Sequence, residues 1–220
     1  MRRQPPPEQI QARSFEIISE LLPDFDQTSQ AWPVVRRIVH TTGDPAVASL
    51  LRIHPAAVAA GVGALLAGKP VLTDVKMLAA GINRKLAGRL GCEVICSNED
   101  PSALAMASER GITRSAAAIL ALAPRIPGSV VAIGNAPTAL FALMDLLNEG
   151  LEPPALIIGT PVGFVGAAES KTELMETTGL RVPYVSIEGT RGGSAIAVAA
   201  VNALLVLATE QLDRRTAVTV

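Results

Sequence analysis

The sequence predicts one α/β domain over residues 1–220, with a doubly wound, mainly parallel five-stranded sheet and helices on both faces, as in flavodoxin-like folds. Two observations lead to this prediction. In the C-terminal half, three short aliphatic runs each end in a glycine-containing turn and precede an Ala-rich helix; the runs are residues 129–133, 155–158 and 184–187. These runs are apolar throughout rather than alternating, which is typical of parallel strands buried on both faces.

Proline and glycine residues delimit the helices predicted in the N-terminal half. Pro23 ends the first helix, while Pro33 lies in the first turn of the second and Gly43 follows its end. Asp74 and Thr113 are each expected to cap a later helix. Helices are predicted at residues 8–22, 32–42, 55–67, 101–110 and 114–122. Four more are predicted with only one end defined: one begins after residue 74, one ends at residue 147, one begins at about residue 165 and the last begins after residue 194. Earlier strands are predicted at residues 71–73 and 92–96, and residues 50–53 could form another short strand.

The composition argues against nucleic acid as a partner. The 19 Lys and Arg residues nearly balance the 20 Asp and Glu residues, and aromatic residues make up only 3% of the chain. A nucleic-acid-binding protein normally has a basic excess and aromatic side chains for base stacking. We therefore exclude that class.

The sequence predicts neither export nor a membrane span. Residues 1–8 are too polar for the apolar region of a signal peptide. The apolar stretch 195–208 is shorter than the roughly 20 residues of a bilayer span and contains Asn202, so we expect a buried final helix. Cys92 and Cys96 would face the same side of one strand, too far apart for a disulfide, which indicates a reduced, cytoplasmic protein.

One of the two histidines lies in a basic segment and is the candidate reactive group. In a helix, Arg37 and His40 are three residues apart and share a face, and Arg36 at i−4 leans the same way. Such a face combines fixed positive charge with a group that titrates near neutral pH, which suits proton transfer to an acidic substrate. The alternative is a histidine that interacts with the helix C-terminus beside solvated arginines, and these residues alone leave both interpretations open.

Glycine-containing turns follow the three C-terminal strands and should meet at the carboxyl edge of the sheet, where open α/β sheets bind ligands. The turns begin at Gly134, Gly159 and Glu188. Each precedes a helix N-terminus, which favours anions, although each glycine taken singly could equally serve turn geometry. Because Arg191 lies in one turn and Arg114 and Ser115 open a further helix, we expect a ligand with several carboxylates or phosphates.

Nucleotide-binding motifs and a metal site are not supported. Residues 63–69 match the first part of a P-loop, but Pro70 stands where Ser or Thr would bind magnesium. The glycines of residues 159–166 depart from the dinucleotide fingerprint, so we expect no nicotinamide or flavin cofactor. His40 and His54 have no Cys or acidic partners at ligand spacing, so we expect no metal.

Seven blocks, in order along nearly the whole chain, carry a family resemblance. They are residues 13–18, 36–40, 73–77, 111–118, 131–140, 161–171 and 191–195. Together they resemble the precorrin-8X methylmutases, also called cobalt-precorrin-8 methylmutases. The ends depart from this pattern, since Pro5-Pro-Pro7 and the tail after Leu212 match nothing in it.

The resemblance implies an isomerase of cobalamin biosynthesis that shifts a methyl group from C-11 to C-12 of a polycarboxylate corrinoid precursor and needs no cofactor. In the family, the histidine of the Arg-x-x-His block is the proposed acid, so His40 is the expected proton donor. Substrate-binding residues are expected at Ser14, Arg37, Arg114, Ser115 and Arg191, which leaves Arg36 as a solvated flank. The resemblance also implies a homodimer with active sites near the subunit interface.

Two other functions stay open at this point. A non-catalytic tetrapyrrole carrier would need the same arginines and glycine turns but not His40. A phosphoryl transferase on such a sheet would need an acidic residue that holds a metal near the helix N-termini. No residue decides whether the natural substrate carries cobalt, and none fixes the protonation state of His40.

Overall fold

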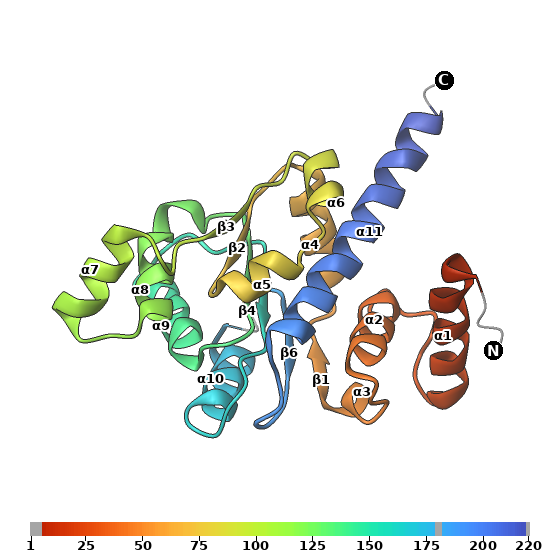
Figure 1. The fold of residues 1–220 in the computed structure, drawn as a ribbon, viewed down its shortest axis with the longest axis horizontal. Helices are drawn as coiled ribbons and strands as arrows, with labels where there is room; N and C mark the ends of the chain where they lie inside the picture. Colours follow the sequence, from red (N-terminus) through yellow and green to blue (C-terminus); the bar gives the residue numbers. More distant parts are fainter. Residues whose placement is uncertain (1–5, 179–181, 219–220) are drawn as a thin grey trace.

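A six-stranded mixed sheet forms the core of the computed structural model, which describes residues 6–178 and 182–218 (Figure 1). The strands are β1 (Leu51–Ile53), β2 (Val71–Thr73), β3 (Val94–Cys96), β4 (Val130–Ile133), β5 (Leu156–Gly159) and β6 (Tyr184–Ile187). Their order across the sheet is β1-β6-β5-β4-β2-β3. Strand β1 pairs antiparallel with β6, and the other pairs are parallel. Without β1, the order read from the other edge is β3-β2-β4-β5-β6. If these five strands are renumbered 1 to 5 along the chain, this is the order 2-1-3-4-5.

The prediction of five strands is wrong, because the described part of the chain forms six. The additional strand is β1, which pairs with β6 from Leu51 opposite Ile187 to Ile53 opposite Val185. The possible strand at residues 50–53 thus forms, directly after the short helix α3 (Val47–Leu50). The prediction of a mainly parallel sheet is confirmed.

Helices cover both faces of the sheet. One hydrophobic cluster joins the sheet to α2, α4 and α11, and a second joins the opposite face to α8 and α9. The helices are α1 (Pro7–Leu21), α2 (Trp32–Thr42), α3, α4 (Ala57–Leu66), α5 (Lys76–Gly81), α6 (Arg84–Arg89), α7 (Pro101–Arg110), α8 (Arg114–Ala121), α9 (Pro137–Asn148), α10 (Ala167–Glu173) and α11 (Ser194–Val218). Among them, α3 and α6 have no counterpart in the predicted elements, because helices of four and six residues lack a full apolar repeat.

Helix α11 is a core helix that extends beyond the apolar stretch 195–208. It has 25 residues, and by length and composition alone Ser194–Ala217 could cross a membrane. However, 56% of its most apolar window is buried inside the protein. Asn202 accepts a hydrogen bond from the N–H of Asn83 (2.8 Å) and donates one to the carbonyl of Gly81 (3.0 Å), so its amide is satisfied within the fold.

Asp74 does not cap the helix that follows it, contrary to the prediction, since α5 has no side-chain cap. The buried carboxylate accepts hydrogen bonds from the N–H groups of Gly134 (3.2 Å), Asn135 (2.8 Å) and Ala136 (2.9 Å), just before α9. Strands β2 and β4 are neighbours, so the end of β2 lies beside this turn, and a helix N-terminus attracts a carboxylate. The Gly134 turn is therefore occupied by Asp74 and not free for a ligand anion.

Replacing Asp74 by alanine should lower the free energy of unfolding by about 2–3 kcal/mol, because three N–H groups lose their acceptor. Urea unfolding followed by circular dichroism measures this change. Asp145→Ala, on an exposed position of α9, is the matched control and should change it by less than ~0.5 kcal/mol. A wild-type unfolding midpoint in Asp74→Ala would contradict the role of the carboxylate.

Candidate active site

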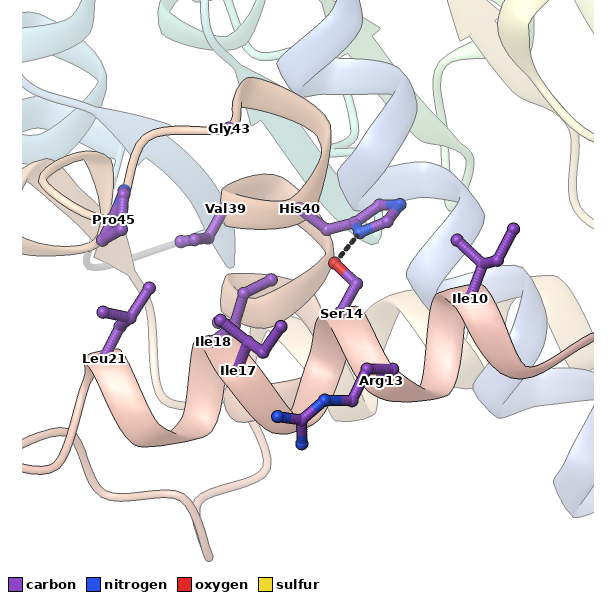
Figure 2. A pocket seen from close by; sticks show the side chains of 10 residues that line it. All are labelled: Ile10, Arg13, Ser14, Ile17, Ile18, Leu21, Val39, His40, Gly43 and Pro45. Carbon is purple, nitrogen blue, oxygen red and sulfur yellow. Dashed lines mark hydrogen bonds between the residues drawn. The ribbon is translucent and has the colours of Figure 1, made fainter. Parts of the chain in front are cut away.

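His40 lies in the last turn of α2 and is held by a serine of α1 (Figure 2). The hydroxyl oxygen of Ser14 lies 2.8 Å from Nδ1 of His40. The other ring nitrogen, Nε2, lies on the far side of the ring from Ser14. In the imidazolium form both ring nitrogens carry protons, so Nδ1–H donates to Ser14 and Nε2–H can donate to a ligand.

The end of α2 is completed without the imidazole. Gly43 adopts the left-handed conformation (φ 64°), and its N–H donates to the carbonyl of Val39. The hydroxyl of Thr42 donates to the carbonyl of Ile38 (3.1 Å). Because the groups that bond to the carbonyls of Ile38 and Val39 come from Gly43 and Thr42, and His40 bonds to Ser14 instead, the geometry favours a ligand-directed histidine over a capping one.

His40 and Ser14 line a cavity of about 350 Å³ between α1 and the end of α2 (Figure 2). The other lining residues are mainly apolar; they are Ile10, Arg13, Ile17, Ile18, Leu21, Val39, Gly43 and Pro45. A mainly apolar wall that also carries an imidazole suits a ligand that has a large hydrophobic surface and a basic atom.

The pKa of His40 is lowered from its ordinary value, mainly by burial and further by the positive charge of Arg37. The imidazole is therefore predominantly neutral at pH 7 in the free protein. An anion placed beside Arg37 would offset that charge and favour the protonated form of His40. The arginine and the histidine that the sequence placed on one helix face thus act on each other electrostatically.

Arg36 and Arg37 stack on the ring of Phe15. Their guanidinium carbons lie 4.2 and 5.0 Å from its centroid, and Nε of Arg36 is buried without a hydrogen-bond partner. Burial is the main cause that lowers the pKa of both arginines, and neither forms an ion pair within the described residues. The expectation that Arg36 is a solvated flank is therefore wrong, because the ring of Phe15, 21 residues away in sequence, covers it.

The two arginines and Phe15 line a second cavity, of about 240 Å³, between α1, α2 and α11. Arg37 also donates a hydrogen bond to the side chain of Gln11 (3.1 Å). The rings of Phe15 and His40 are nearly perpendicular (77°), with 5.4 Å between their centroids. Arg37 and His40 thus both lie against Phe15 but line different cavities.

Arg191 reaches the end of α2 from the turn after β6. Its guanidinium pairs with the carboxylate of Asp44 at 2.6 Å, and Asp44 follows Gly43, where α2 ends. The side chain of Arg191 stays half exposed. The structure therefore brings Arg191 to the helix that carries His40. Local sequence patterns could not reveal this role of Asp44, because its partner lies 147 residues away.

Arg114 and Ser115 do not join this group. They open α8, where Thr113 is the predicted N-cap and accepts the N–H of Ala116 (3.2 Å). Helix α8 packs with α7 and α9, at the opposite end of the sheet from α2 (Figure 1). Of the predicted site residues, the structure thus gathers Ser14, Arg37, His40 and Arg191, and leaves Arg114 and Ser115 apart.

The described residues contain no group of three or more His, Cys, Asp or Glu side chains that could hold a metal ion. Both cysteines are free thiols, and burial raises the pKa of Cys92. Neither cysteine lines the cavity beside His40.

Comparisons with known proteins agree on one family. The family model described as precorrin-8X methylmutase matches residues 9–207. A cobalt-precorrin-8 methylmutase of Priestia megaterium is 39% identical over 92% of this chain and 88% of its own length. A precorrin-8X methylmutase of Pseudomonas aeruginosa is 49% identical over 76% of this chain and 80% of its own length. Among solved structures, the precorrin-8X methylmutase of Thermus thermophilus has a TM-score of 0.83 at 36% identity, covering 92% of this chain and 98% of that one.

The electrostatic link between Arg37 and His40 can be measured by NMR titration of the His40 ring. Arg37→Gln should raise the pKa of His40, because it removes a nearby positive charge. Lys85→Gln, on the distant helix α6, is the control variant. An unchanged or lower pKa of His40 in Arg37→Gln would disprove the link.

Proposed function

Since the chain belongs to the precorrin-8X methylmutase family, we propose that it catalyses the reaction of that family with His40 as the proton donor. The reaction is an isomerisation in cobalamin biosynthesis. A methyl group moves from C-11 to C-12 of precorrin-8X or cobalt-precorrin-8, giving hydrogenobyrinate or cobyrinate. The observation that carries the role of His40 is its hydrogen bond to Ser14 at the edge of an apolar cavity.

The geometry of the imidazole supports proton donation through Nε2. When His40 is protonated, Nδ1–H donates to Ser14 and fixes the ring, and Nε2–H is the donor left for a nitrogen of the macrocycle. Protonation there withdraws electron density from the conjugated path and lowers the barrier to methyl migration. A positioned general acid typically contributes about 10²–10⁴-fold. The proton returns to His40 after the shift, so substrate and product have the same composition.

The arginines of the site supply positive charge for the substrate carboxylates. Arg37 lies against Phe15 beside His40, and Arg191 lies at the end of α2. Arginine can bind a carboxylate through two parallel N–H donors, which would fix the ring relative to His40. Because Arg191 is paired with Asp44, a substrate carboxylate would share or replace that partner. Ser14 lines the same cavity as His40 and is a further substrate contact in this proposal.

We also propose a homodimer in which each active site takes residues from both subunits. His40 and Arg114 lie at opposite ends of the sheet, so a second subunit is the simplest way to bring both to one macrocycle. Large apolar side chains remain exposed after β2 and β5, namely those of Met77 (75%), Phe164 (92%) and Val165 (90%). Exposed apolar side chains of this size support an interface that covers them.

The finer class of the fold and the location of the protein are part of the same proposal. The 2-1-3-4-5 order of β2 to β6, with helices on both faces, supports a flavodoxin-like doubly wound sheet in a single methylmutase domain. The free thiols of Cys92 and Cys96 support a cytoplasmic location.

Incubation with precorrin-8X or its cobalt form tests the activity. The wild type should change the absorption spectrum of the substrate at unchanged mass, because the reaction is an isomerisation. His40→Ala should lower turnover by about 10²–10⁴-fold while still binding the substrate. His54→Ala, outside the cavity, should retain wild-type turnover. No spectral change with the wild type would exclude the activity, whereas wild-type turnover in His40→Ala would exclude only the proton-donor role.

Mixing two inactive variants tests the shared active site. If each site takes His40 from one subunit and Arg114 from the other, a mixed dimer of His40→Ala and Arg114→Ala has one intact site. Unfolding and refolding the two variants together in equal amounts should therefore restore about a quarter of the wild-type turnover, by random pairing. Each variant refolded alone is the control. No recovery, with mixed dimers shown by native mass spectrometry, would place both residues of a site in one subunit.

A further inference from the structure

Lys171 is a fully buried lysine (0% exposed) on α10 that the proposed chemistry does not use. No ion pair within the described residues involves it. Burying an ammonium group without an opposite charge is costly. Burial lowers the pKa of Lys171 to about 8, which leaves it mostly protonated at pH 7. Retaining such a group in the interior indicates that its hydrogen bond has a function.

The ammonium group of Lys171 donates to the backbone carbonyl of Arg191, in the turn between β6 and α11. The same turn is held by two backbone hydrogen bonds, from Gly193 N–H to Thr160 O (2.8 Å) and from Gly163 N–H to Thr190 O (3.2 Å). Lys171 therefore adds a side-chain hydrogen bond to the turn of residues 190–193, whose backbone otherwise bonds to residues 160–163 after β5.

The turn packs closely against the backbone of residues 160–161 at Gly192. A Cβ atom on Gly192 would lie 2.4 Å from the carbonyl oxygens of both Thr160 and Pro161. Only glycine fits such a contact. The backbone of residues 160–161 therefore prevents the turn from moving closer to it. The carbonyl of Arg191 thereby stays at the ammonium group of Lys171, while the guanidinium of Arg191 pairs with Asp44.

The geometry assigns Lys171 as a positioning residue for the reaction: it fixes the turn of residues 190–193, and thereby the guanidinium of Arg191 that meets the substrate. The assignment rests on the proposed role of Arg191 in substrate binding. Methionine at position 171 would keep most of the apolar volume of the side chain but remove the terminal donor. Lys171→Met should therefore weaken substrate binding while leaving proton transfer by His40 nearly intact.

A double-mutant cycle distinguishes positioning from a general structural role. Lys171→Met should raise KM about tenfold with kcat changed less than about threefold, since a charge-assisted hydrogen bond is lost away from the reacting atoms. In an Arg191→Ala background, the same substitution should change KM less than about twofold. Lys85→Met, on the surface of α6, is the matched control and should change KM in neither background. Equal factors in both backgrounds would overturn the assignment.

Amide hydrogen exchange gives a second readout that does not depend on enzymatic activity. The N–H of Gly193 should exchange at least about tenfold faster in Lys171→Met than in the wild type or Lys85→Met, because the turn loses the hydrogen bond from Lys171 to the carbonyl of Arg191. Unchanged protection would overturn the assignment even if the wild type proved to lack methylmutase activity. Lys171→Gln, too short to reach Arg191, is the second variant. If neither variant folds, Lys171 is a structural residue and the assignment is wrong.

Discussion

The position of His40 depends on the packing of α2 against α11. Val34, Val35 and Ile38 of α2 are completely buried in the cluster that contains α11 and one face of the sheet. Truncating one such side chain typically costs about 2–5 kcal/mol, and a displacement near 1 Å is enough to impair proton transfer. The sheet therefore orients the imidazole indirectly: it fixes α11, α11 fixes α2, and Ser14 of α1 sets the rotation of the ring.

Two buried ionisable side chains fix turns at the carboxyl edge of the sheet, and each is satisfied by backbone groups. Asp74 accepts three N–H groups before α9, and Lys171 donates to the carbonyl of Arg191. Burial raises the pKa of Asp74 and lowers that of Lys171, so both are displaced toward their neutral forms. An oppositely charged side chain beside Asp74 or Lys171 would reduce the cost of burying each charge. It would not, however, hold the backbone of the turn in place, as the present hydrogen bonds do.

The sequence predicted most elements whose ends are marked by local chemistry. Pro33 and Gly43 bound α2 to the residue, and Thr113 caps α8 as expected. The errors concern contacts between distant residues: β1 is a strand because β6 lies beside it, and Asp74 bonds to a turn 60 residues away rather than to its own helix. The bond between Ser14 and His40 likewise spans 26 residues, so only the family resemblance, and not local spacing, linked the two.

The depressed pKa of His40 is consistent with a proton donor once the substrate is considered. In the free protein, burial and the charge of Arg37 hold the imidazole neutral. Substrate carboxylates bound beside Arg37 would offset that charge, so binding would raise the pKa of His40 and draw a proton onto it. By linkage, the substrate then binds more tightly as the pH falls toward the range where His40 is already protonated. In the proposed mechanism Arg37 would therefore have two effects: it would attract the carboxylates, and until they bind its charge disfavours the acid form of His40.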